Sequence, residues 1–236
     1  MEQTLTGIGL YTLSEAAYIL QLKTSQLRRW VEGYSIYSTD RRRIPPVICH
    51  GVLRLNGEII LTFHDLLELN VIRLFRQAGV SLQTIRLAMK RASELFETER
   101  PFILPRFATD GKRIFVELSQ KLLEEREEPS RSRIMMDINK GQLVLESIAR
   151  EFFVKLDYGG LEPLRYWPKG RHNPIVIDPH RAFGKPIEDK SGVPTAILYQ
   201  MFQNGTPPTD IARWYNMDEA AVNAAISYEQ ERRQAA

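Results

Sequence analysis

Apolar positions near the start of the chain recur at the spacing of an α-helix. Four of them share one face of a helix predicted from residue 13: Leu13, Ala16, Ala17 and Leu20. Thr12 and Glu15 stand three residues apart at its start, the spacing of a capping box, in which each side chain accepts a backbone N–H. Gln21, Leu22 and Lys23 then leave room only for a turn. The pattern therefore predicts a short capped helix followed by a tight turn.

A second helix begins after that turn, with Thr24 or Ser25 as its cap. Its apolar residues Leu27 and Val31 predict a buried face, which leaves the polar residues pointing outward. Two short helices joined by a tight turn are typical of a helix-turn-helix, whose second helix enters the major groove of DNA. The outward side chains can donate hydrogen bonds to bases and phosphates. We expect DNA contacts from Thr24, Ser25, Gln26, Arg28 and Arg29.

The next arginines lie around a predicted hairpin. Residues 34–46 are polar and basic and end in Pro45-Pro46, so we expect a loop there. Asn56-Gly57 then stands between two arms of β-branched and leucine residues and favours a type I′ turn. A hairpin directly after a helix-turn-helix is a wing. We expect its arginines to contact phosphates or the minor groove: Arg41, Arg42, Arg43 and Arg54.

Longer amphipathic patterns follow the hairpin. One helix is predicted from His64 to an αL-type cap at Gly79, and Ser81 caps another that runs to Phe96. Residues 97–172 carry turn-forming glycines between apolar arms, which favours a small α+β segment with β-rich character. The turns are expected at Asp110-Gly111, Asn139-Lys140-Gly141 and Gly159-Gly160.

The last part of the chain predicts three helices. A linker of proline, glycine and charged residues leads to a short strand at 175–177. Helices are then expected over 195–204, from Pro208 onward, and after Asp218. The fold class is mainly α with small β elements (α+β). We expect three domains: a winged helix-turn-helix over 1–96, a connecting segment over 97–172 and a trihelical domain over 173–236.

Composition narrows the class of function. The 236 residues are 43% hydrophobic, and the net charge is +3. An arginine pair and an arginine triplet lie in the N-terminal half, so a nucleic-acid surface is expected there. The single cysteine, Cys49, excludes an intramolecular disulfide and a cysteine-based zinc site. No apolar run has membrane-spanning length, and no charged-then-apolar leader opens the chain. We therefore expect a cytoplasmic protein without a membrane partner.

The run FHDLLELNVIRLFRQAGVSLQTIRLAMKRA resembles the MerR-type winged-helix regulators. The shared features are an aspartate that opens the first helix, a glycine break, and Ser-Leu before a second amphipathic helix. Upstream, QLRRWVEG is similar to the recognition helix of that family. The resemblance implies that Arg28 contacts DNA and that Trp30 packs while touching the DNA backbone. The chain lacks the long coiled-coil dimer helix and the effector cysteines of metal-sensing members, so metal sensing is not expected.

A second resemblance covers the stretch from Ile177 to Glu231. It resembles small antitoxin domains, formerly of unknown function, that are found beside PIN-like toxin genes in bacteria. The shared features are Ile-Asp-Pro, the turn at 183–186, the helix start at 192–195 and the break at Gly205. Taken together, the two halves are similar to VapB-type antitoxins. The resemblance implies an autorepressing antitoxin whose partners are its own promoter DNA and a PIN-like ribonuclease toxin.

The C-terminal domain is expected to contact protein. Acids at the start of its third helix would repel phosphate, so removal of residues 190–236 should leave some DNA affinity but weaken dimerisation. A homodimer is the expected state of a helix-turn-helix protein. The linker carries three basic residues whose exposed side chains are candidates for the toxin contact: Lys169, Arg171 and Arg181. Charges that only make the linker soluble would produce the same pattern.

No enzyme is predicted. The four histidines are scattered without metal spacing, and no phosphate-binding loop or nucleophile motif stands out. We therefore expect no catalytic residue, no metal site and no cofactor. The alternative to an antitoxin is a stand-alone MerR-like regulator, or an excisionase-like DNA-binding protein, that has no toxin.

Overall fold

The computed structural model describes residues 8–36, 42–48, 50, 52–125 and 128–235. Within these ranges it describes the side chains of all residues except 36, 42, 119–137, 149–150 and 235. The chain divides into two compact units. Unit 1 contains residues 1–23, 55–63 and 155–236, and unit 2 contains residues 24–54 and 64–154. Each unit is discontinuous in sequence, in contrast to the three contiguous domains predicted. Helices predominate and the strands form small sheets, so the α+β fold class is confirmed.

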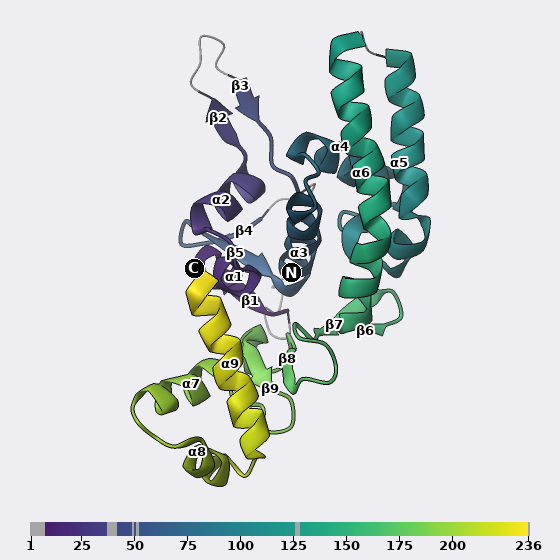
Figure 1. Cartoon of the computed structure of the whole chain (residues 1–236). Coiled ribbons are helices and arrows are strands. Elements are labelled where there is room, and N and C mark those ends of the chain that lie inside the picture. The colour runs from purple at the N-terminus through teal and green to yellow at the C-terminus, as the bar shows by residue number, and fades with distance from the viewer. Residues whose placement is uncertain (1–7, 37–41, 49, 51, 126–127, 236) are drawn as a thin grey trace, which may run out of the picture. The chain divides into compact units, whose positions relative to one another are not determined.

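Unit 1 begins with the strand β1 (Leu10–Thr12) and the helix α1 (Leu13–Leu20) (Figure 1). The Thr12 hydroxyl accepts the Glu15 N–H at 3.2 Å, and the Glu15 carboxylate accepts the Thr12 N–H at 2.9 Å. The predicted capping box is therefore confirmed. Gln21 ends the helix with a φ of 54°, and Leu22 N donates to Ala17 O across the predicted turn.

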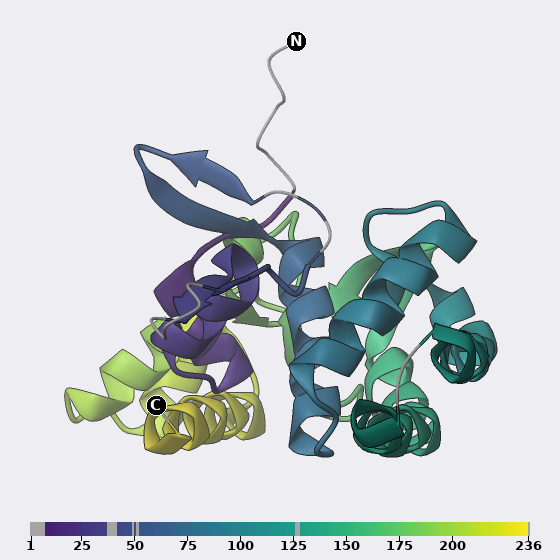
Figure 2. The same ribbon diagram turned by 90° about the horizontal axis from the view of Figure 1, so that it is seen from above.

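The hairpin predicted at Asn56-Gly57 is confirmed. Its arms are β4 (Leu53–Leu55) and β5 (Glu58–Thr62), and the two turn residues have φ angles of 50° and 83°. Positive φ at both positions is what a type I′ turn requires. The antiparallel partner of β5 on its other edge is β1, so the sheet has the order β1-β5-β4 (Figure 2).

A four-stranded antiparallel sheet, in the order β6-β7-β8-β9, follows in unit 1. Its strands are β6 (Leu156–Gly159), β7 (Glu162–Tyr166), β8 (Ile175–Ile177) and β9 (Pro186–Glu188). The turn after Gly159 and the strand at 175–177 are as predicted. The segment predicted as a linker instead connects neighbouring strands of this sheet. It contains successive hydrogen-bonded turns, from Gly170 N to Trp167 O and from Asn173 N to Gly170 O.

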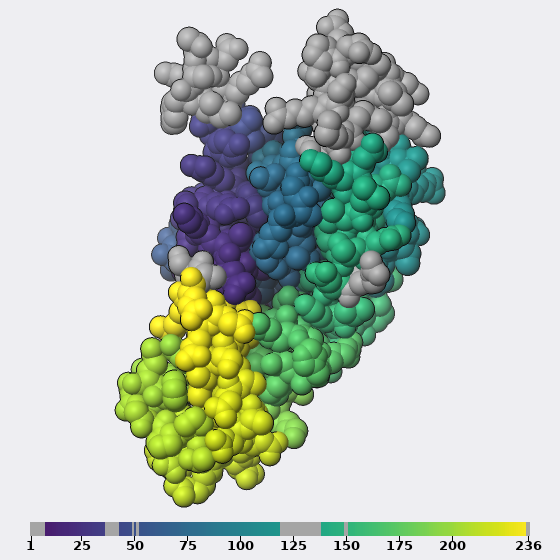
Figure 3. Space-filling view, in the orientation of Figure 1, coloured from purple at the N-terminus to yellow at the C-terminus, as the bar shows by residue number. Residues whose placement is uncertain are grey.

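Three helices complete unit 1: α7 (Thr195–Gln203), α8 (Pro208–Tyr215) and α9 (Glu219–Ala235). Gly205 follows α7 with a φ of 90°, and Pro208 opens α8, where its missing N–H has no cost. Apolar side chains from the three helices and β8 form one core: Ile175, Leu198, Ile211, Val222 and Ala225. The atoms of these helices form a continuous surface in Figure 3, coloured yellow-green to yellow. The predicted trihelical arrangement is confirmed.

Unit 2 begins with the helix α2 (Thr24–Glu32) and a short hairpin of β2 (Tyr34–Ile36) and β3 (Arg42–Ile44). The helices α3 (Phe63–Gln77) and α4 (Leu82–Phe96) follow. Gly79 has a φ of 85° after α3, and the Ser81 hydroxyl accepts the Thr84 N–H at 3.2 Å. Both ends are formed as predicted.

The part of unit 2 after residue 100 differs from the prediction. A single 3-10 turn, η1 (Pro101–Ile103), leads into the long antiparallel helices α5 (Pro105–Glu125) and α6 (Glu128–Phe152) (Figure 1). The β-rich character and the turns predicted at Asp110-Gly111 and Asn139-Lys140-Gly141 are therefore wrong. The helices α5 and α6 have 21 and 25 residues and pack against each other within the chain.

Two glycines explain this difference, because they mark the close approach of α5 and α6. A Cβ on Gly111 would lie 2.7 Å from Leu145 Cδ2, and one on Gly141 would lie 2.4 Å from Phe115 Cε1. Glycine here makes room for a neighbouring side chain, whereas the sequence suggested that it makes a turn. The Phe115 ring also packs on Phe75 of α3, with 5.8 Å between ring centroids.

Candidate nucleic-acid interface

The helix α2 presents the polar face that its sequence predicts. Leu27 and Val31 are buried on the opposite face, with 0% and 4% of their surface exposed. Five of the residues of this helix that are predicted to contact DNA are exposed or partly exposed: Thr24, Ser25, Gln26, Arg28 and Arg29. Their hydroxyl, amide and guanidinium groups are donors that suit phosphate oxygens and base-edge acceptors.

Trp30 is the exception. Its side chain is 2% exposed and lies on the same helix face as Leu27 and Val31, three and one positions away. Its backbone carbonyl accepts the N–H of Val47 at 2.8 Å. Packing of Trp30 agrees with the expectation from the MerR resemblance. The expected contact of its ring with the DNA backbone is corrected, because a ring buried in this position does not reach the surface.

One carboxylate joins two arginines of this surface. Arg28 Nη1 lies 3.2 Å from Glu32 Oε2, one turn further along α2, and Arg54 of β4 pairs with Glu32 Oε1. The side chains of Arg28 and Arg54 are 57% and 50% exposed, so solvent screens both ion pairs. The hydrogen bond from Arg54 lowers the pKa of Glu32 below its usual range. The group therefore carries two positive charges and one negative charge and stays open to solvent.

A second basic group follows at the end of α2. The Arg29 guanidinium lies 5.7 Å from the centroid of the Tyr34 ring, within the range of a cation–π contact. In the ladder of β2 and β3, Ser35 pairs with Arg43 and Ile36 with Arg42. Arg43 is exposed. Arg41 lies outside the described residues, as does the side chain of Arg42.

The loop predicted for residues 34–46 is therefore wrong in part. Tyr34, Ile36 and Ile44 supply the alternating apolar positions of two three-residue strands. Such short runs carry little signal, and the adjacent charges and prolines favoured a loop. As a consequence, Arg42 and Arg43 belong to a separate hairpin ahead of the one at Asn56-Gly57, and only Arg54 lies in the predicted wing.

A buried charged group in unit 2 has no counterpart in the sequence prediction. His50 Nε2 lies 3.2 Å from Glu68 Oε2 and 3.4 Å from Asp65 Oδ1. Arg100 Nη2 lies 2.9 Å from the same Asp65 oxygen, and Glu68 also accepts the N–H of Phe102. The His50, Asp65 and Glu68 side chains are at most 3% exposed. The group ties the segment before β4 to α3 and to the start of η1.

Burial and mutual charge decide where the proton of this group resides. Burial lowers the pKa of His50, but the hydrogen bond with Glu68 and the charges of Asp65 and Glu68 outweigh it, so the pKa is raised. Burial also raises the pKa of Glu68, against the effect of His50. Two carboxylates face one imidazole, so we place the proton on His50. The signal in the sequence is Asp65 and Glu68 three residues apart inside an apolar stripe, which requires a basic partner.

Three ion pairs within unit 1 engage the basic residues predicted to contact a toxin: Lys169 with Glu231, Arg171 with Asp157, and Arg181 with Asp189. Arg171 Nη1 lies 2.5 Å from the Asp157 oxygen, and Arg181 Nη1 lies 3.1 Å from the Asp189 oxygen. These pairs connect loop residues with the helix α9, with the strand β6 and with a further loop of the same unit. Contact of the three residues with a toxin stays a prediction.

Two further kinds of feature are absent from the described part of the chain. Across the described ranges, no group of three or more His, Cys, Asp or Glu residues is arranged to hold a metal ion. In the same ranges no helix is long and apolar enough to cross a membrane. The exposed donors and cations of α2, β3 and β4 suit a polyanionic partner such as the DNA duplex.

Comparison with known proteins extends this picture to the whole chain. Residues 9–89 match the family described as "Putative DNA-binding HTH domain", and residues 175–228 match the family described as "Protein of unknown function (DUF433)". The chain is 26% identical over 225 residues, 93% of each protein, to the protein named "Putative antitoxin VapB45" of Mycobacterium tuberculosis. The crystal structure of Rv2018 from Mycobacterium tuberculosis has a TM-score of 0.71 and 21% identity, over 94% of this chain and 99% of that chain. The latter similarity shows a common fold.

Proposed function

We propose that this protein is the antitoxin of a type II toxin–antitoxin system. It neutralises a PIN-like ribonuclease toxin, binds its own promoter DNA as an autorepressor, and acts as a homodimer without catalysing a reaction. The observation that carries the proposal is the solvent-exposed arginine surface of α2 and β4, within a region that matches a family of DNA-binding domains. The antitoxin role is supported by similarity along almost all of both chains to a protein named as an antitoxin.

In the proposed complex, α2 enters the major groove with its first turn leading. Thr24 and Ser25 donate to phosphates, and Arg28 and Arg29 reach base edges, where a bidentate guanidinium is specific for guanine. Arg43 and Arg54 lie against flanking phosphates. Before binding, Glu32 pairs with Arg28 and Arg54, so its carboxylate competes with DNA phosphates for both guanidinium groups.

The toxin is held by unit 1 in this proposal. Asp218 and Glu219 are exposed at the start of α9, where a recognition helix would require groups that tolerate phosphate. Unit 1 therefore suits a protein partner better than a second duplex.

Co-expression with the protein encoded by the neighbouring reading frame tests the proposal. We expect the two proteins to co-purify, the nuclease activity of the partner to be suppressed, and a fragment of the shared promoter to bind the complex. Binding of promoter DNA without any co-purifying partner would instead favour a stand-alone regulator. Loss of both interactions would exclude the proposed function.

A further inference from the structure

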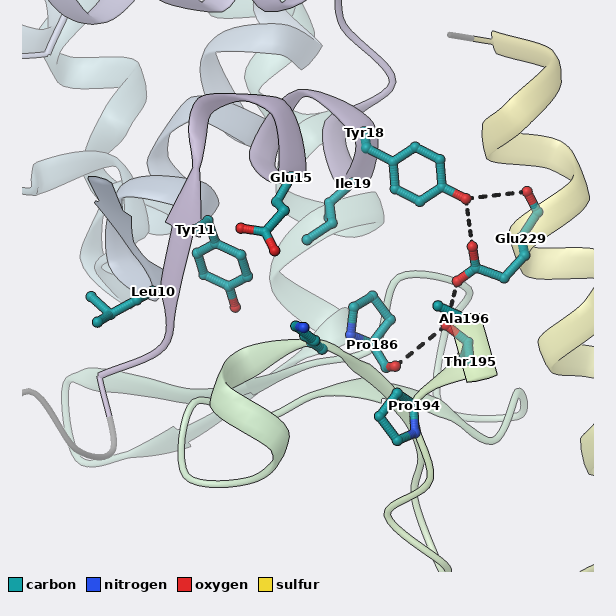
Figure 4. A pocket seen from close by; sticks show the side chains of 11 residues that line it. Leu10, Tyr11, Glu15, Tyr18, Ile19, Pro186, Pro194, Thr195, Ala196 and Glu229 are labelled. Atoms are coloured by element: carbon teal, nitrogen blue, oxygen red, sulfur yellow. Dashed lines mark hydrogen bonds between the residues drawn. The ribbon is translucent and has the colours of Figure 1, made fainter. Parts of the chain in front are cut away.

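Unit 1 contains a small pocket that no part of the proposed DNA contact uses. It has a volume of about 180 Å³ and opens between α1, β9, the start of α7 and α9 (Figure 4). Its walls are mainly apolar or aromatic: Leu10, Tyr11, Ile19, Pro186, Pro194 and Ala196. Pockets for drug-sized ligands usually hold about 300 Å³ or more. This pocket is instead of a size for a single amino-acid side chain.

A buried carboxylate, Glu229 of α9, lies at this pocket. Its side chain accepts the Tyr18 hydroxyl at 2.5 Å on Oε2 and the Thr195 hydroxyl on Oε1 (Figure 4). Glu229 is 2% exposed, and in the described part of the chain it has no ion pair. Burial raises the pKa of Tyr18 to about 12, the hydrogen bond to Glu229 adds to this rise, and Arg233 of α9 acts against it. Neither hydroxyl that donates to Glu229 carries a positive charge, and Arg233, one turn further along α9, is exposed to solvent.

The lining selects the charge of an occupant. Its ionisable side chains other than the tyrosines are Glu15, Glu229 and Lys185, of which Glu15 and Lys185 are exposed. A phosphate or carboxylate would be repelled by the carboxylate of Glu229. A purely apolar group would desolvate that carboxylate without giving it a partner, which costs free energy. A cation on an apolar stem satisfies both parts of the lining. The stem packs on the apolar walls, and the charge reaches Glu229 beside the Tyr18 ring.

The turn that leads into the pocket lining carries a feature that suits a protein partner. Phe183 is 77% exposed on the 3-10 turn η3 (Ala182–Gly184), and its φ is 56°, a strained angle for a bulky residue. Tyr11, a wall residue, holds this turn because its hydroxyl donates to Gly184 O at 2.7 Å. Strained residues persist where surrounding contacts hold them, and they concentrate at functional surfaces. Lys185 and Pro186, which line the pocket, directly continue this turn.

We propose that the pocket receives a lysine or arginine side chain of the toxin, with Phe183 as an apolar contact at its edge. The identity of the partner rests on the proposed function, whereas the cation preference of the pocket does not. A central side chain in a desolvated pocket, surrounded by aromatic contacts, is the usual form of an interface hot spot. The charges are arranged in the opposite way to the contact predicted for Lys169, Arg171 and Arg181. There this protein supplies the basic side chain, and here it supplies the acidic one.

Matched substitutions test the pocket in the full-length protein. Ala196→Trp fills it from an exposed position, and Ala220→Trp adds the same ring at an exposed position of α9 that does not line it. Calorimetric titration with the protein from the neighbouring reading frame should show affinity falling about tenfold or more for Ala196→Trp and for Glu229→Gln. Ala220→Trp should bind as the wild type does. Unchanged affinity in both pocket variants, with all variants folded by circular dichroism, would overturn the proposal.

A probe without the toxin separates this proposal from the proposed function. Nα-acetyl-lysine methylamide should shift the NMR signals of Thr195 and Tyr18 in the wild type, and the uncharged Nα-acetyl-norleucine methylamide should shift them less at equal concentration. The lysine effect should disappear in Ala196→Trp. If no protein partner is found but the lysine probe binds, the antitoxin role fails and the cation site stands. Equal shifts from both probes would remove the cation site even if a toxin binds elsewhere.

Discussion

At the scale of single residues, Glu32 controls how available Arg28 and Arg54 are to phosphate, because its carboxylate pairs with both. Glu32→Gln removes that competition and leaves the arginines in place. We expect it to tighten DNA binding at low salt and to steepen the salt dependence, while Arg28→Ala loses about 1–3 kcal/mol of binding energy. Fluorescence anisotropy of a labelled promoter fragment at several salt concentrations measures both effects.

The matched control for this prediction is Glu94→Gln on α4. Glu94 is also an exposed acid that pairs with an arginine, Arg91, but it lies outside the proposed interface. It should change the affinity only slightly through net charge. If Glu94→Gln tightened binding as much as Glu32→Gln, the local competition described for Glu32 would be refuted.

The buried His50 group leads to a prediction of pH dependence. The pKa of His50 is raised in the folded state. The contribution of His50 to the free energy of unfolding is therefore fully present below the pKa of the unfolded state, and it is lost as the pH rises through the pKa of the folded state. The facing groups are Asp65, Glu68 and Arg100. His50→Gln should therefore destabilise the protein by about 1–3 kcal/mol near pH 6 and by clearly less near pH 9. Urea unfolding at the two pH values measures this, and the exposed His172→Gln serves as control. A larger loss at pH 9 would show that His50 is bound as the neutral imidazole.

At the scale of elements, the sequence predicted those helices and strands whose ends carry their own chemistry. The capping box at Thr12, the Asn56-Gly57 turn and the Ser81 cap all depend on contacts within a few residues, and the structure confirms each. The α5–α6 pair could not be found in the same way. Its glycines are explained by side chains about 30 residues away along the chain, which local patterns do not contain.

The same glycines provide a test of that explanation. In a helix, Gly→Ala normally stabilises by about 1 kcal/mol. At Gly141 the new methyl group would meet the ring of the buried Phe115, so Gly141→Ala should instead destabilise by about 1–3 kcal/mol. At Gly111 it would meet only the flexible end of Leu145, so Gly111→Ala should be nearly neutral. Thermal unfolding of both variants decides the matter, and stabilisation by Gly141→Ala would contradict the packing described here.

The sequence predicts those parts of the candidate interface that lie on a predicted helix or hairpin. The exposed face of α2 follows from helical periodicity, and Arg28 and Arg29 lie there as expected. The pairing of Arg54 with Glu32 joins residues 22 positions apart, and the separate β2–β3 hairpin rests on two three-residue strands. The burial of Glu229 depends on its partners Tyr18 and Thr195, which lie 211 and 34 positions away along the chain. Long-range pairing is therefore the part that the sequence does not reveal.

At the scale of the whole molecule, unit 1 unites the two ends of the chain. Tyr18 of α1 donates to Glu229 of α9, and Tyr11 of β1 donates to Gly184. A chain ending at residue 189 loses α7, α8 and α9, whose core cannot be replaced by the remaining strands. We expect hydrogen exchange to show that the amides of α1 lose protection in this chain, while those of α3 and α4 in unit 2 keep theirs.

The DNA affinity of the shortened chain follows from the same division. Unit 2 retains α2 with Arg28, Arg29 and Arg54, so salt-dependent binding to duplex DNA should persist. Discrimination between the promoter and an unrelated fragment should fall, because the matched helix-turn-helix region begins at residue 9 and includes α1. Tyr18→Phe in the full-length protein is the appropriate comparison, since it removes the hydroxyl that donates to Glu229 and leaves the three helices in place. If the shortened chain kept both the protection of α1 and full promoter discrimination, the N-terminal segment would be stable without the C-terminal helices, and the coupling of the two chain ends would have no functional consequence.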